Sequence, residues 1–213
     1  NDNFLDIERL EALAYYMWTP PDGIDYSGNS YSLTPPEGGI EVDEFIMSYN
    51  NNTNAKWVYD ELAGGWLRYH DLPNMYDPSG EFYPMLDRLN QKQLIFNNVI
   101  VVFMPHEVLN GDATIIDTLF ELGDVGDAWL FRDGKFYDIN WAHRYWEWEI
   151  STWKTRPFKF IYDDGNSVAL HPGNTWVNFV TPWTCLKEAI EGAVDCLEPS
   201  PDLEDWIVKF GNP

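Results

Sequence analysis

Hydrophobic and polar residues alternate in short runs along most of the chain, as they do in β-strands that bury one face. Residues that favour tight turns separate these runs, and Asp-Gly is the strongest short signal for a hairpin. Asp133-Gly134 and Asp163–Asn166 are two such turns. The pattern predicts three hairpins: Lys56–Tyr59 with Gly65–Tyr69, Ala128–Arg132 with Lys135–Ile139, and Phe158–Tyr162 with Ser167–Leu170.

Two further runs predict central strands. Leu94–Met104 is long and rich in β-branched residues, and Trp176–Val180 follows a Pro172-Gly173 turn. We expect residues Ile40 to Val180 to form an antiparallel sheet system, a small barrel or a sandwich, with strands across Gln93–Met104 and Trp176–Val180 at its centre. The fold class is therefore mainly β (α+β), with helices only near the ends.

A short helix is predicted close to the N-terminus. Asp6 is a suitable N-cap, apolar residues recur at helical spacing up to Met17, and Pro20 ends the pattern after Trp18. The segment Pro21–Gly39 is rich in Pro, Gly and Ser and reads as an extended connector. We therefore divide the chain into residues 1–39, a helix and connector, and residues 40–213, a β-rich domain.

Near the C-terminus the hydrophobic period changes to that of a helix. Apolar residues recur at helical steps from Leu186 to Leu197, which predicts an amphipathic helix with its apolar face on the sheet. Cys185 and Cys196 are the two cysteines of the chain, and an unbroken helix would hold them about 16 Å apart. A disulfide needs Cα atoms within about 7 Å. We predict the disulfide, with the helix ending at Gly192.

Charge excludes several classes of partner. The formal net charge is −22, with 13 Lys and Arg against 35 Asp and Glu, so we expect no binding to nucleic acid or to anionic lipid headgroups. No run approaches the ~20 apolar residues of a membrane span. The segment Asn1–Asp6 has neither the basic nor the apolar part of a secretory signal. The protein is then either cytosolic or a mature or trimmed form, and we expect the second because the numbering begins without Met.

Four strings in the β-rich part agree in order and type with a known family. They are KWVYDELAGGWLRY (Lys56–Tyr69), QLIFNNVIVVFMPH (Gln93–His106), GDAWLFRDGKFYDINW (Gly126–Trp141) and YDDGNSVALHPGNTWVNFV (Tyr162–Val180). With them the chain resembles the C-terminal part of the YerB-like family of predicted bacterial lipoproteins. Asn3–Tyr15 is similar to the helix that links the two parts of that family.

The resemblance implies an exported protein of the cell envelope, lipid-anchored at an N-terminus that lies outside this chain. The family's larger N-terminal domain has no counterpart here, so the chain resembles a C-terminal fragment or a separately processed piece. The family offers no reaction and no catalytic residues that could be transferred.

Common catalytic and metal-binding signatures are missing from the sequence. There is no G-x-S-x-G, H-E-x-x-H, Walker loop or C-x-x-C-H, and the four histidines are scattered over different elements. An oxygen-rich group could suggest calcium, although the Asp-Gly turn explains its main part: Asp163, Asp164 and Asn166, with Asp124 and Asp127. We expect no catalytic residue, no metal and no cofactor.

The densest aromatic segment is Trp141–Trp153, which is longer than the corresponding part of the family pattern. If it is a strand, Trp146 and Trp148 lie on one face and Tyr145, Glu147 and Glu149 on the other, which suits a cover for the core. Rings interleaved with acidic residues also suit a contact surface for a glycan or a protein. We expect the segment to protrude with one Trp partly exposed. The candidate binding residues are Trp141, Tyr145, Trp146, Trp148 and Trp153.

The sequence leaves two functions open. The first is a non-catalytic extracytoplasmic domain that binds an envelope protein or a glycan, or supports the missing N-terminal domain. The alternative is a carboxylate-dependent hydrolase acting on cell-wall glycan, for which Glu147 and Glu149 are the first candidates. A cleft with two carboxylates about 5 to 9 Å apart would favour the hydrolase. The oligomeric state is left open.

Overall fold

The computed structural model describes residues 28–50, 53–71, 81–108, 116–118, 125–143, 150–151, 159–187 and 195–211. The chain divides into two compact units: residues 1–28 with 145–157, and residues 29–144 with 158–213. Only Gly28, Ile150 and Ser151 of the first unit belong to the described residues. All strands of the described chain lie in the second unit.

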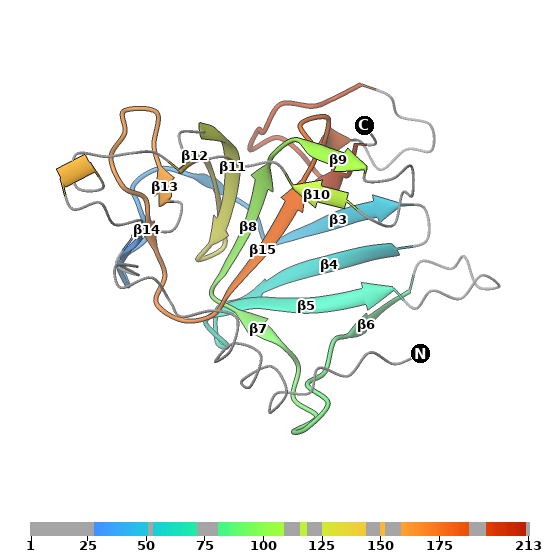
Figure 1. Ribbon diagram of the computed structural model, residues 1–213. Helices are drawn as coiled ribbons and strands as arrows, with labels where there is room; N and C mark the ends of the chain where they lie inside the picture. Colours follow the sequence, from blue (N-terminus) through green and yellow to red (C-terminus); the bar gives the residue numbers. More distant parts are fainter. Residues whose placement is uncertain are drawn as a thin grey trace, which may run out of the picture. The chain divides into compact units, whose positions relative to one another are not determined.

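One sheet of the second unit has seven strands in the order β16-β17-β3-β4-β5-β6, with β7 also paired to β5 (Figure 1). Strands β3, β4 and β5 form an antiparallel meander, whereas β17 runs parallel to β3. The bounds are β3 (Glu44–Asn50), β4 (Thr53–Asp60), β5 (Gly65–Asp71), β6 (Phe82–Pro84), β7 (Ile95–Phe96), β16 (Cys185–Lys187) and β17 (Ile207–Lys209).

The other large sheet has six strands in the order β13-β12-β11-β8-β15, with β2 paired to β12. Its predicted β11–β12 hairpin is confirmed, and Asp133 and Gly134 adopt φ values of 52° and 69°, as a turn that matches the strand twist requires. The bounds are β2 (Ile40–Glu41), β8 (Asn98–Phe103), β11 (Val125–Arg132), β12 (Lys135–Ala142), β13 (Lys159–Ile161) and β15 (Thr175–Val180).

Two small strand pairs complete the described structure. Strand β1 (Ser30–Tyr31) runs parallel to β14 (Ala169–Leu170), and β9 (His106–Val108) is antiparallel to β10 (Ile116–Thr118). The first pair places the described end of the predicted connector beside β14. The predicted boundary between residues 39 and 40 stays a prediction.

Strand β8 separates two hydrophobic cores. Val99 and Val101 contribute to a core shared with the seven-stranded sheet, whereas Ile100 and Val102 belong to a second core. A strand buried on both faces needs apolar residues at every position, which explains the continuous β-branched run in the sequence. The shared core is rich in aromatic residues, among them Phe45, Trp57, Trp66, Phe131, Phe136 and Trp206.

The structure confirms a mainly β fold and corrects its expected details. The two large sheets are open, so the domain is not a barrel. Strand β15 is an edge strand that runs parallel to β8, which makes the prediction of a central, antiparallel Trp176–Val180 strand wrong. Asn98 fixes this arrangement, because its side chain donates to the His171 carbonyl and the Thr175 hydroxyl and accepts from the His171 amide.

The third predicted hairpin is confirmed at its turn and in the first part of its pairing, since the Val168 amide donates to the Phe160 carbonyl at 2.9 Å. Tyr162 donates its amide to the Asn166 carbonyl, and Ile161 pairs with Ser167 in an antiparallel bridge. The chain then leaves this partner, and β14 pairs with β1 instead of extending the hairpin. The first predicted hairpin is confirmed as β4 and β5.

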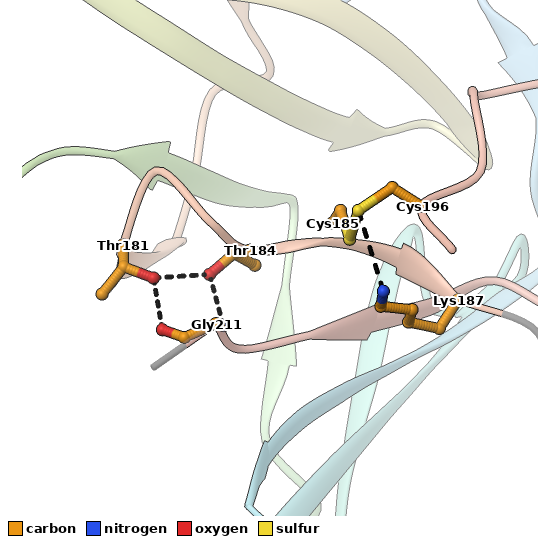
Figure 2. Close-up of a disulfide and its surroundings, with 6 residues drawn as sticks. All are labelled: Thr181, Thr184, Cys185, Lys187, Cys196 and Gly211. Atoms are coloured by element: carbon orange, nitrogen blue, oxygen red, sulfur yellow. Dashed lines mark hydrogen bonds between the residues drawn. A yellow bond between two sulfur atoms is a disulfide. The ribbon is translucent and has the colours of Figure 1, made fainter. Parts of the chain in front are cut away.

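The expected C-terminal helix is wrong where the chain is described. Residues Cys185–Lys187 form β16, and the Leu197 amide donates to the Leu186 carbonyl at 3.0 Å, so the chain returns beside itself. This return brings the Cα atoms of Cys185 and Cys196 to 5.7 Å, and the predicted disulfide is confirmed (Figure 2). Residues 188–194 and the predicted N-terminal helix from Asp6 to Trp18 lie outside the described residues.

The chain end is tied to the turn that precedes the disulfide. Figure 2 shows Thr181, Thr184 and Gly211 in one hydrogen-bonded group. The Gly211 amide donates to the Thr184 hydroxyl at 3.1 Å. A Cβ at position 211 would collide with the Trp183 backbone, so this close approach requires glycine. The tie and the disulfide together hold β16 and β17 on the sheet.

The disulfide should be present in the folded protein and should stabilise it. We expect thiol titration of the unfolded, unreduced protein to find no reactive thiol. Replacing both residues, Cys185→Ser with Cys196→Ser, should lower the free energy of unfolding in urea by about 3 kcal/mol, because it frees the loop in the unfolded chain. Two reactive thiols per chain would contradict the expectation.

Candidate functional site

A hollow of about 430 Å³ opens at one end of β3, β4 and β5, and we call it the Arg68 pocket. Its volume lies within the range of small-molecule sites. The chain that follows β6 closes one side of it. The pocket is lined by Tyr49, Thr53, Asn54, Arg68, His70, Asp71, Met85 and Leu86.

Arg68 lies on the inward face of β5. Side chains alternate along a strand, so Arg68 shares its face with the fully buried Trp66. It pairs in register with Trp57 on β4. The guanidinium carbon lies 5.5 Å from the centroid of the Trp57 ring and 4.4 Å from that of Trp176, the second of which comes from the other large sheet. Two cation–π contacts therefore hold the positive charge in place.

Hydrogen bonds link three residues next to Arg68, namely Tyr49, Trp176 and Asn178. Asn178 Oδ1 accepts from the Tyr49 hydroxyl at 2.5 Å and from the Trp176 indole nitrogen at 2.9 Å. Burial raises the pKa of the Tyr49 phenol, and the charge of Arg68 and a hydrogen bond from it counteract this in part. Burial also lowers the pKa of Arg68. Burial thus disfavours both charged forms, and no ion pair with a described carboxylate neutralises either group.

The acidic side chain of the pocket is already engaged. Asp71 accepts from the Asn54 backbone amide at 2.8 Å and from the Asn54 side-chain amide at 2.7 Å. The two residues lie opposite each other on β5 and β4, one step beyond the Ala55–His70 pair. Each carboxylate oxygen of Asp71 therefore has a donor, and the residue fixes the strand ends.

The opposite wall is apolar. The Met85 amide donates to the Arg68 carbonyl at 2.9 Å, and the Met85 carbonyl accepts from the Leu94 amide at 2.8 Å, which holds this wall against β5. The Met85 sulfur contacts Arg68 Nη1. Leu86 is 47% exposed at the rim. The pocket can therefore offer charge and hydrogen bonds on one side and carbon surface on the other.

Of the predicted aromatic binding residues, only Trp141 belongs to the described structure. It is 2% exposed in the second core, and its indole nitrogen donates to the Phe103 carbonyl at 2.8 Å. A Cβ on Gly126 would lie 2.6 Å from that nitrogen, so this close packing requires glycine at position 126. Trp141 is a core residue in this structure. Tyr145, Trp146, Trp148 and Trp153, and also Glu147 and Glu149, lie outside the described residues.

The described acidic residues do not gather around a metal-binding position. Within the described ranges, no group of three or more His, Cys, Asp or Glu side chains is placed to hold a metal ion. Asp164 accepts from the amide and the side chain of Asn166, and Asp163 accepts from Asn140 at 2.7 Å. These bonds build the turn. Asp124 lies outside the described residues.

Asp138 is a carboxyl with a shifted pKa. Partial desolvation on β12 and the neighbouring carboxylates of Asp127 and Asp163 raise its pKa. A carboxyl with a raised pKa is the kind of group that can donate a proton in catalysis. None of these three residues lines the Arg68 pocket.

Comparison with protein families matches residues 45–177 to the family described as the C-terminal domain of a protein of unknown function, DUF3048. The chain belongs to this family. This DUF3048 C-terminal domain contains every residue that lines the Arg68 pocket. The match confirms the YerB-like resemblance of the sequence strings.

Among solved structures the domain is similar to the YerB protein from Bacillus subtilis. The TM-score is 0.49 and the sequence identity 20%, over 82% of this chain and 49% of that one. The chain thus spans about half the length of that protein. A comparison with curated proteins finds no match. In the described residues, no helix has the length and apolar character needed to cross a membrane.

Sequence reasoning missed the Arg68 pocket, although one signal was present. Strict alternation from Trp66 places Arg68 and His70 on the buried face of β5, and a charged residue at an inward position is unusual. The residues that identify Arg68 as part of a pocket lie on β15 and in the segment after β6. Pairing between these distant segments could not be read from the sequence.

The raised pKa of Asp138 gives a test by pH. A carboxyl with a higher pKa in the folded state binds its proton more tightly there, so stability falls as the pH rises through the folded pKa. We expect Asp138→Asn to raise the melting temperature at pH 7, and this gain to shrink as the pH falls toward the ordinary value of 3.8.

Glu37→Gln is the matched control, because it removes one negative charge at an exposed position and Glu37 is not among the charges that shift the pKa of Asp138. Equal melting shifts for Asp138→Asn and Glu37→Gln at every pH would mean that only the net charge matters, and would contradict a local effect.

Proposed function

We propose that this DUF3048 C-terminal domain is a non-catalytic extracytoplasmic binding domain of the cell envelope, and that the Arg68 pocket is its binding site. Its ligand would belong to an envelope protein or a glycan. One observation supports the proposal most: the pocket combines a charged group, polar groups and an apolar wall, but its described lining holds no pair of carboxylates.

The number of carboxylates in the pocket lining distinguishes a binding site from a site for glycoside hydrolysis. Glycoside hydrolysis by the usual mechanism requires one carboxyl as an acid and another as a nucleophile or base. Among the described lining residues, Asp71 is the one carboxylate, and both of its oxygens accept hydrogen bonds from Asn54. Such an oxygen is poorly placed to attack a substrate or to activate water. The pocket is therefore better suited to holding a ligand than to cleaving one.

The disulfide supports an extracytoplasmic location. Cys185 and Cys196 are bonded, and disulfides persist mainly in oxidising compartments. Export to the envelope, with a lipid anchor outside this chain, is what the YerB-like resemblance implies. Location and anchoring are parts of the proposal.

A second candidate function is hydrolysis of cell-wall glycan through carboxylates other than Asp71. The raised pKa of Asp138, beside Asp127 and Asp163, is the observation that favours it. In that case Asp138 would act as the proton donor. The appearance of new reducing ends, and their loss in Asp138→Asn, would distinguish this function from binding.

The proposal can be tested by closing the pocket. Thr53 lies at the exposed start of β4 on the pocket lining, so Thr53→Trp should fill the opening without entering the core. We expect the immobilised wild-type chain to retain solubilised cell-wall fragments or envelope proteins, and Thr53→Trp to retain at least about tenfold less, a loss of about 1.4 kcal/mol in binding.

The matched control is Leu62→Trp, which adds a similar ring at a fully exposed hairpin tip outside the pocket lining. It should retain as much as the wild type. Equal retention by all three proteins would contradict the pocket as the binding site. Shortened glycan with new reducing ends would instead support the hydrolase.

A further inference from the structure

Arg68 has more hydrogen-bond donors than its surroundings can use. A guanidinium carries five N–H donors, and the polar contacts of Arg68 are the Met85 sulfur and the Tyr49 hydroxyl. Sulfur in a thioether is a weak acceptor. The Arg68 Nε atom is buried without a hydrogen-bond partner. None of the ion pairs in the described part of the chain involves Arg68.

Arg132 shows how the same protein treats a purely structural arginine. Its side chain is fully buried, with an exposed fraction of 0%. It donates to the Asp133 carboxylate at 2.6 Å, the Ala169 carbonyl at 2.6 Å and the Ser32 carbonyl at 3.1 Å. Arg132 therefore has a counter-ion and two further acceptors, whereas Arg68 has no counter-ion among the described acidic residues.

A second donor without an acceptor lies in the network that supports Arg68. The Trp176 indole nitrogen can only donate, so the Asn178 atom that it contacts must be the oxygen, and the Asn178 amide nitrogen is fixed on the other side. That nitrogen is buried without a hydrogen-bond partner. The surroundings of the guanidinium are thus rich in donors and poor in acceptors, which favours a ligand that supplies acceptor oxygens.

The charges around the pocket limit the ligand to one negative charge. A single guanidinium matches a planar carboxylate with two parallel hydrogen bonds. Among the described residues that line the pocket there is no lysine or second arginine, and Asp71 adds a negative charge to its wall. The net charge of −22 further disfavours a dianion such as a phosphate monoester.

We propose that the Arg68 pocket binds a small organic monocarboxylate, with its carboxylate paired to the Arg68 guanidinium and its carbon body against Met85 and Leu86. This inference rests on the proposed function, because it names the ligand class of the same pocket. The carboxylate belongs either to an acidic sugar or to the C-terminus of a short peptide, and titration with one acid of each kind distinguishes the two.

The test compares each acid with its neutral amide by calorimetric titration of the intact chain. The probes are glucuronate with glucuronamide, and N-acetyl-alanyl-alanine with its C-terminal amide. We expect one acid to bind with a Kd below about 10 mM and its amide to bind at least about tenfold more weakly. The acid that binds more tightly identifies the source of the carboxylate.

Three variants locate the binding charge. Arg68→Met keeps an apolar stem beside Trp176 but loses the charge, and should weaken binding of the acid at least about tenfold. Arg68→Lys keeps the charge without the two-pronged geometry and should fall in between. Lys56→Met is the charge-matched control on β4, where Lys56 pairs with Glu44 at 2.7 Å, and it should bind like the wild type. Melting curves establish that each variant is folded.

Several results would overturn the inference. They are equal binding of acid and amide by the wild type, a folded Arg68→Met that binds the acid like the wild type, or no acid binding below about 10 mM. If retention of envelope material depends on an open pocket but acid and amide bind equally, the carboxylate inference alone fails. If retention is unchanged in Thr53→Trp, the proposed function fails, and the acid–amide comparison decides the inference by itself.

Discussion

The packing of aromatic rings between the two large sheets is the interaction on which the rest of the structure depends. Phe45 from the seven-stranded sheet stacks on Phe131 from the six-stranded sheet, with ring centroids 3.8 Å apart. Trp66 meets both rings edge to face. Fully burying a large apolar side chain contributes about 1.5–3 kcal/mol, and aromatic pairs add about 0.5–1.5 kcal/mol. These contacts hold together two sheets that neither share a strand nor close into a barrel.

The same aromatic layer leads to the candidate site. From Phe45 it continues through Trp57, at 6.1 Å between centroids, and from Trp57 to Trp176, at 5.7 Å. Arg68 covers both indoles at the edge of this layer. The guanidinium thus lies where the apolar interior meets the pocket, and rigid rings on two sheets set its position. Packing against the rings fixes the orientation of the guanidinium without a counter-ion from the described residues. Its charge therefore stays available to a ligand.

Local patterns in the sequence predicted local structure well. The alternation around Asp133-Gly134 and the hairpin from Lys56 to Tyr69 needed only neighbouring residues, and both are confirmed. Strand order was a different problem. Whether β15 pairs with β8 in parallel depends on Asn98 and on contacts with a segment far along the chain, which hydrophobic period does not record.

The misread C-terminal segment has a related cause. Apolar residues from Leu186 to Leu197 fit a helical period, but the disulfide between Cys185 and Cys196 requires a chain that turns back. The covalent constraint prevailed at Cys185–Lys187, which is a strand.

The Arg68 pocket was missed for the same reason as the strand order, since its residues come together only through tertiary structure. Trp141, by contrast, was proposed for a surface because aromatic density alone does not distinguish a core from an interface.

An anion site in so acidic a chain requires that a local contact outweigh a distant field. The net charge of −22 is spread over the chain, and at physiological ionic strength charges more than about 8 Å away are largely screened. Two opposite charges about 4 Å apart attract by about 1 kcal/mol in bulk water and by about 4 kcal/mol near a protein surface, where the effective dielectric constant is lower. Arg68 meets the second condition, because Trp57 and Trp176 exclude water from its faces. Within the pocket lining, the carboxylate of Asp71 repels an anion. Two donors from Asn54 partly offset this charge. The acidic surface therefore disfavours multivalent anions at a distance while a single carboxylate in contact with Arg68 retains its attraction.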